Sequence, residues 1–122
     1  MNKSIEKTLD KYYTNPDIAK QCLDHIQTLA LPTPDLWLEP SAGNGSFYHH
    51  LPHPKKGIDI HPDHQDIIKK NFFEWKPTKK HKTIYAIGNP PFGKNATLAI
   101  KFFNQSAKYC TLIAFIVPKT FE

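Results

Sequence analysis

The chain has 122 residues, of which 39% are hydrophobic and 22% are charged. This length and composition predict one globular domain over residues 1–122. The longest apolar runs, such as residues 112–117, are far too short to cross a membrane, and residues 1–10 are too charged for a secretory signal. The only two cysteines, Cys22 and Cys110, exclude a disulfide scaffold and predict the cytoplasm or another reducing compartment.

The net charge is +5, and all sixteen basic residues are lysine. A positive chain permits a polyanionic partner such as nucleic acid. Lysine attracts phosphate as a point charge, whereas the planar fork of arginine reads guanine edges. We therefore expect contacts with a nucleic-acid backbone rather than with its sequence, although an AT-rich genome would produce the same lysine bias.

The first half of the chain predicts a helix followed by two strands. The helix is expected to begin at Pro16 and to place Ile18, Cys22, Ile26 and Leu29 on its apolar face. The segments expected next are a strand at residues 36–38, a tight loop at 41–45, a short helix at 46–51 and a strand at 57–60.

The second half continues the alternation of helices and strands. The expected segments are a helix at residues 61–70, a short strand end at 72–73, a basic linker at 76–82, a strand at 83–87, a helix at 95–107 and a strand at 112–117. Leu98, Ala99 and Phe102 are expected on the inner side of the last helix. Further aromatic residues expected in the core are Trp37, Phe103 and Phe115.

Strands that alternate with helices predict an α/β fold with a parallel sheet. Right-handed crossovers make this sheet doubly wound and Rossmann-like, with the strand order 3-2-1-4-5. Ligands of such sheets bind at the carboxyl ends of the strands. The residues that follow each strand are therefore the candidates for binding and chemistry.

A glycine-containing loop follows the first strand. It reads Glu39-Pro40-Ser41-Ala42-Gly43-Asn44-Gly45. Two glycines at this spacing let the backbone turn sharply and approach a ligand closely. The pattern differs from the GxGxxG fingerprint of dinucleotide-binding proteins, and an ordinary strand-to-helix turn is the alternative interpretation.

Polar residues also follow the next two strands. Asp59 can accept hydrogen bonds from two ribose hydroxyls, although a solvated aspartate at a strand end is at least as common. After the third strand, Asn71 can pair with an adenine edge and Phe72 can stack on its ring. These residues indicate a nucleoside site only in combination.

The tetrapeptide Asn89-Pro90-Pro91-Phe92 follows the fourth strand. Its two prolines fix the backbone and remove two donors. The amide oxygen of Asn89 and the carbonyl of Pro90 can then act as paired acceptors, and Phe92 offers a flat surface. Two acceptors and a stacking face suit a planar amine, such as the amino group of a flipped base.

Together these segments resemble the amino-terminal catalytic part of a class I S-adenosylmethionine-dependent methyltransferase of the N6-adenine type. The matching segments are residues 39–45 for the cofactor loop, Ile58-Asp59-Ile60 for the ribose acid and Asn89-Pro90-Pro91-Phe92 for the target amine. Residues 11–16 resemble the segment that closes over the cofactor in that family, and residues 115–118 resemble its fifth strand.

The resemblance implies that S-adenosyl-L-methionine is the cofactor and methyl donor. The implied catalytic residues are Asn89, Pro90, Pro91 and Phe92. The implied cofactor-binding residues are Tyr13, Thr14, Glu39, Ser41, Ala42, Gly43, Gly45, Asp59, Ile60, Asn71, Phe72 and Asn89. Residues 1–15 would form the cofactor-closing segment.

The implied reaction is methyl transfer to the exocyclic N6 amine of adenine, with DNA preferred to RNA as the substrate. Two alternatives stay open: an incomplete or inactive module that binds the cofactor or a partner chain, and a protein glutamine N5-methyltransferase. The family's last two strands are missing after residue 122, which leads us to expect a catalytic domain that is incomplete at its C-terminal end. The fifth strand would then be an open edge suited to self-association or to a partner chain.

Histidine spacing is the remaining signal. His50 and His53, and likewise His61 and His64, stand three apart, as in some zinc sites. No cysteine lies near either pair, and prolines interrupt the first. We expect solvated loop histidines and no metal site.

Overall fold

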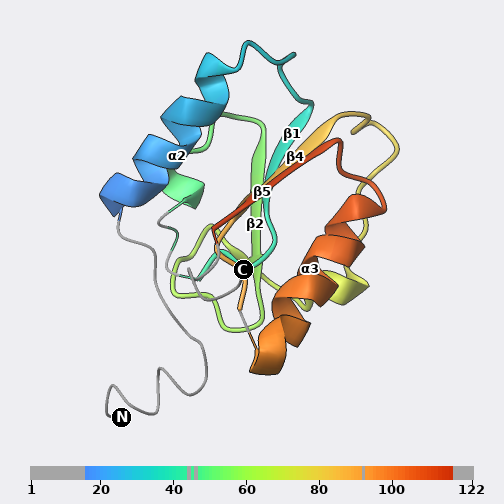
Figure 1. Cartoon of the computed structure of the whole chain (residues 1–122). Helices are drawn as coiled ribbons and strands as arrows, with labels where there is room; N and C mark the ends of the chain where they lie inside the picture. The colour runs from blue at the N-terminus through green and yellow to red at the C-terminus, as the bar shows by residue number, and fades with distance from the viewer. Residues whose placement is uncertain (1–15, 44, 46, 92, 117–122) are drawn as a thin grey trace.

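Five short strands form one parallel sheet in the order β3-β2-β1-β4-β5, flanked by helices, in a computed structural model that describes residues 16–43, 45, 47–91 and 93–116 (Figure 1). This confirms the predicted Rossmann-like α/β fold and its strand order. The strands are β1 (Leu36–Glu39), β2 (Lys55–Asp59), β3 (Ile68–Lys69), β4 (Ile84–Gly88) and β5 (Leu112–Phe115). The helices are α2 (Pro16–Thr28) and α3 (Thr97–Ala107), with single 3₁₀ turns at η1 (Tyr48–His50), η2 (Phe72–Glu74) and η3 (Lys94–Ala96).

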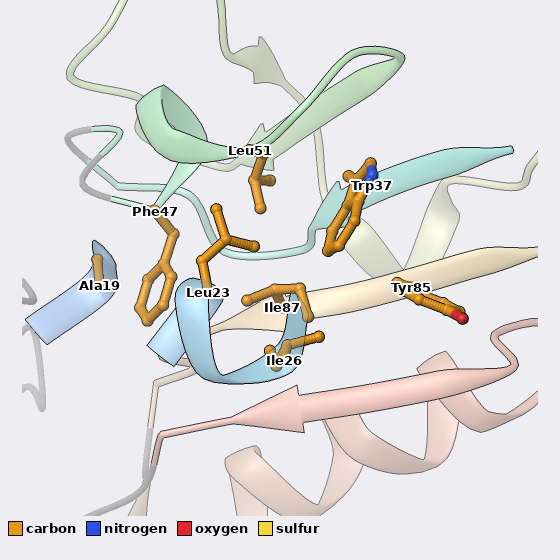
Figure 2. Packing of buried hydrophobic residues seen from close by; sticks show 8 residues of the cluster. All are labelled: Ala19, Leu23, Ile26, Trp37, Phe47, Leu51, Tyr85 and Ile87. Carbon is orange, nitrogen blue, oxygen red and sulfur yellow. The ribbon is translucent and has the colours of Figure 1, made fainter. Parts of the chain in front are cut away.

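Helix α2 covers one face of the sheet. Its residues Ala19, Leu23 and Ile26 are buried, and Figure 2 shows Leu23 and Ile26 beside Ile87 of β4. The predicted apolar face was therefore wrong at its edges, because Ile18 is 44% exposed and Leu29 is 51% exposed. The predicted apolar residues and the residues that are buried both recur at helical spacing. Packing against the sheet therefore decides which side of the helix is buried.

Helix α3 and η2 cover the opposite face. Phe102 of α3 stacks on Phe72 with 5.5 Å between ring centroids and 4° between ring planes. Leu36, Leu38 and Ile84 complete this core from the two central strands. The inward positions predicted for the last helix are confirmed for Ala99 and Phe102, which are buried, and Leu98 packs against the same cluster.

The core prediction was wrong for Phe103, which is 49% exposed, and confirmed for buried Trp37. Phe103 lies one residue past Phe102, so the helical rotation turns it away from the sheet. Phe115 is half-buried and packs against the cluster on the α3 face.

The helix predicted at residues 61–70 is absent, and turns lead into β3 instead. The N–H of Asp66 donates to Nδ1 of His64 at 3.1 Å, and the N–H of Ile67 donates to the His64 carbonyl at 3.2 Å. These bonds divert donors that a helix would need. The N–H of Asp63 also donates to the Gly43 carbonyl at 3.0 Å, which ties this segment to the loop after β1.

Two other predicted segments differ in type. Residues 72–73 begin the turn η2 rather than end a strand, because the side chain of Asn71 accepts a hydrogen bond from the Phe73 N–H and caps that turn. The short helix predicted at 46–51 is the single turn η1. The nearby Lys55 side chain donates to the Tyr48 carbonyl at 2.9 Å and helps to hold that turn in place.

Strand β5 pairs with β4 and lies at the edge of the sheet in the described part of the chain. All four of its residues are half-buried. Among the described residues, no helix combines the length and the apolar character needed to span a bilayer.

Replacing Phe72 with alanine should lower the free energy of unfolding by about 3–5 kcal/mol, because the change empties a buried aromatic position. The same truncation at exposed Phe103 should change it by only about 0.5 kcal/mol. Urea denaturation of both variants measures the difference. Equally small losses would contradict the core role of Phe72 and favour its predicted role as a stacking surface for a ligand.

Candidate functional site

The carboxyl ends of β1, β2 and β4 meet at one edge of the sheet. Gly88 ends β4 so close to Glu39 of β1 that a Cβ atom at Gly88 would lie 3.1 Å from the Glu39 Cγ. The loop after β1 is held to β2 by the Gly43 N–H, which donates to the Asp59 Oδ2 at 2.9 Å. Three strand ends predicted to carry chemistry are thus brought together, as the switch point of this topology requires.

The loop after β1 has the backbone geometry that its glycines predict. Gly43 has a φ of 56° and Gly45 a φ of 86°, values that side chains other than glycine rarely adopt. The Ala42 N–H donates to the Ile58 carbonyl and the Gly45 N–H to the Ala42 carbonyl, both at 2.9 Å. The loop is therefore a tight turn anchored on β2, with Ser41 half-buried and Ala42 buried at its start.

Asp59 joins two loops of the site. Its Oδ2 accepts from the Gly43 N–H, and its Oδ1 accepts from the His61 N–H at 2.8 Å. A carboxylate offers about four acceptor positions, so each oxygen can accept a further hydrogen bond. The residue is only half-buried, which leaves it accessible to a ligand.

Glu39 is the unusual residue of the site. Its side chain is 3% exposed, and its Oε1 has no hydrogen-bond partner among the described residues. Burial raises the pKa of Glu39 well above its ordinary value, and the charge of Asp59 raises it further, while the backbone N–H of Tyr48 acts in the opposite direction. A buried carboxyl group with an unpaired oxygen is costly unless a donor or a cation completes it.

The tetrapeptide begins directly after Gly88. Asn89 and Pro91 are half-buried and Pro90 is buried, whereas Phe92 lies outside the described residues. Ile60 follows Asp59 and is 56% exposed, which leaves an apolar side chain open beside the predicted ribose acid. Tyr13 and Thr14, like the rest of residues 1–15, also lie outside the described residues.

Asn71 and Phe72 lie after β3, as predicted, but both already have partners. The Asn71 Oδ1 accepts from the Phe73 N–H at 3.0 Å. Phe72 is 2% exposed, with Phe102 stacked on it and Trp75 nearly parallel to it at 6.5 Å. This packing disfavours the prediction that Phe72 stacks on a nucleoside.

Sequence reasoning missed two glycines that shape the site. Gly88 makes room for Glu39, and a Cβ atom at Gly57 would lie 2.9 Å from the Tyr48 ring and 3.1 Å from the Ala42 Cβ. Gly57 also pairs with Glu39 in the register of β1 and β2. The sequence signal that could have identified them is a glycine within the last three residues of β2 and of β4, the two strands that flank β1.

An apolar groove of about 330 Å³ lies between α2 and the carboxyl ends of β4 and β5. It contains none of the predicted site residues, and it runs along the strand where association with another chain is predicted. Its lining residues are Gln21, Cys22, His25, Ile26, Phe47, Ile87, Ala114, Phe115 and Ile116.

The histidines do not gather into a larger cluster within the described part of the chain. His49 and His64 pack edge to face with 4.5 Å between ring centroids. No group of three or more histidine, cysteine or acidic side chains suited to a metal ion occurs among the described residues.

Comparison with models of known protein families finds no match for this chain, and a search of curated proteins finds none either. The chemistry of the site is therefore inferred from its residue types and from the geometry of the strand ends.

Replacing Glu39 with glutamine should stabilise the protein at neutral pH. The raised pKa means that the folded chain holds this proton more tightly than the unfolded chain. Its contribution to stability is therefore complete below the unfolded pKa and declines as pH rises toward the folded pKa. Glutamine removes this decline.

Chemical denaturation between pH 4 and pH 8 measures the effect. Glu74→Gln, at an exposed position, is the matched control and should leave the decline in place. A Glu39→Gln variant with the pH profile of the unaltered protein would show that Glu39 is ionised in the fold.

Proposed function

We propose that this chain is an S-adenosylmethionine-dependent methyltransferase that acts on the exocyclic N6 amine of adenine in DNA. The observation that carries the proposal is the meeting of Glu39, Asp59 and the start of the tetrapeptide at Asn89 on one edge of the sheet. Each comes from a different strand end, and each carries oxygen acceptors.

The described residues fit the proposed cofactor. S-Adenosylmethionine carries an ammonium group and a sulfonium centre, and a cation is what a buried carboxyl group with an unpaired oxygen requires. Glu39 would therefore face the cationic end, with the loop residues Ser41, Ala42, Gly43 and Gly45 beside it. Asp59 would accept from the ribose hydroxyls, and Ile60 would cover the base.

When bound, the cofactor supplies an electrophilic methyl group. The chain's task is to hold the attacking amine, because the lone pair of an adenine amine is delocalised into its ring. The Asn89 amide oxygen and the Pro90 carbonyl would accept from the amine and keep its lone pair directed at the methyl group. Pro91 would stiffen this pair of acceptors, and Phe92 would support the base.

The positions of the cysteines argue against transfer to cytosine C5, which requires a nucleophilic thiolate. Burial raises the pKa of Cys110 to about 12, and Cys22 lines the apolar groove rather than the site. Both thiols are free. Free thiols support the proposal that the protein works in the cytoplasm or another reducing compartment.

The direct test is methyl transfer from labelled S-adenosylmethionine to DNA, RNA and protein, followed by nucleoside analysis. We expect N6-methyladenine in DNA. Label in RNA alone would correct the substrate, and label on a protein glutamine would favour the alternative reaction. Cofactor binding without any transfer would favour a binding module.

Asn89→Ala should abolish most turnover and leave cofactor affinity within about tenfold, which corresponds to ~1.4 kcal/mol. The variant removes one acceptor for the target amine and leaves Glu39 and Asp59 intact. Asn89→Asp is the matched control, because it keeps an acceptor oxygen and should retain more activity. A fully active Asn89→Ala variant would show that the tetrapeptide is only a turn.

A further inference from the structure

The charges of this chain are divided unevenly along its sequence. Residues 75–121 contain eight of the sixteen lysines and none of the eleven acidic residues. This segment supplies the linker before β4, then β4, the tetrapeptide, α3 and β5. Strands β4 and β5, helix α3 and the segments that connect them therefore contain lysines but no acidic residue.

Helix α3 arranges part of this charge in a line. Lys101, Asn104 and Lys108 follow the spacing i, i+3, i+7, which places them on one side of the helix, and all three are exposed. Lys108 keeps helical backbone angles as the C-cap, with φ −66° and ψ −27°. Ala99, Phe102 and Ser106 form the buried side of α3, so the side with the lysines faces away from the sheet.

A further exposed lysine precedes α3 in the segment that follows the tetrapeptide. Lys94 lies in η3, five residues after Asn89, and is exposed. From there α3 runs away from the carboxyl edge of the sheet. Along a helix, Lys101 and Lys108 are about 10 Å apart at ~1.5 Å per residue.

Ile100, which is 46% exposed, borders this line because it lies four residues before Asn104, whereas Phe103, which is 49% exposed, points to a different side of the helix. Helix α3 contains no acidic residue, so no carboxylate on it opposes the attraction of these lysines for phosphate groups. Helix α2, on the opposite face of the sheet, carries Asp17 and Asp24 together with Lys20 and lacks this character.

We propose that the outer side of α3, defined by Lys101, Asn104 and Lys108, binds the phosphate backbone of a nucleic-acid strand without reading its sequence, together with Lys94 of η3. The inference rests on the proposed function for its choice of nucleic acid as the polyanion. Asparagine and lysine donate to phosphate oxygens, and such contacts position a strand rather than select bases. The strand would then be held beside the tetrapeptide.

Binding of fluorescent oligothymidylate, followed by anisotropy across a salt series and without cofactor, tests the proposal. Lys101→Gln/Lys108→Gln should lower the slope of log affinity against log salt by about 1.4, at ~0.7 per lost contact, and weaken binding about tenfold at low salt. Lys79→Gln/Lys80→Gln removes the same charge from the exposed linker and should have a clearly smaller effect. Circular dichroism confirms that both variants fold.

Equal losses in the two double variants would overturn the proposal, since they would indicate diffuse attraction by net charge. Polyglutamate that binds as tightly as the oligonucleotide, with the same loss in Lys101→Gln/Lys108→Gln, would also overturn it and point to an acidic protein. Oligothymidylate contains no adenine and the assay contains no cofactor. A failure of methyl transfer therefore leaves this result unaffected, and the two proposals fail separately.

Discussion

The buried carboxyl group of Glu39 is the constraint on which the site depends. It ends the central strand β1, where Gly88 of β4 leaves no side chain in its way, and its Oε1 lacks a partner among the described residues. Burying such a group opposes folding unless it stays protonated or meets a cation. The fold thus keeps a destabilising group at its switch point, which is expected where binding rather than stability determines the residue.

The hydrogen bonds of Asp59 explain how short loops hold this site in place. One oxygen binds the loop after β1 through Gly43 and the other binds the loop after β2 through His61. The Asp63 N–H donates to the Gly43 carbonyl, so a second hydrogen bond joins the loop after β2 to the loop after β1. Asp59 therefore positions the glycine loop and still has acceptor capacity for the ribose that we propose it binds.

The fold and the positions of the strand ends could be predicted from the sequence because each buried strand is followed by turn residues. The segment at residues 61–70 could not, because the ring and the carbonyl of His64 accept from the Asp66 and Ile67 N–H groups, donors that a helix would need. Adjacent aromatic residues were also ambiguous. Phe72 could serve as core or as a ligand surface, and only packing against Phe102 shows that it is core. The burial of the Glu39 carboxyl group, and the lack of a partner for its Oε1, leave no pattern in the neighbouring sequence.

We propose that Glu39 holds the cationic end of the cofactor. Titration calorimetry of S-adenosylmethionine at pH 7, in buffers of different ionisation enthalpy, tests it directly. A cation beside Glu39 lowers the pKa that burial has raised, so binding should release protons, and Glu39→Gln should bind more weakly and release none. Binding without proton release in the unaltered protein, or unchanged proton release in Glu39→Gln, would contradict the account.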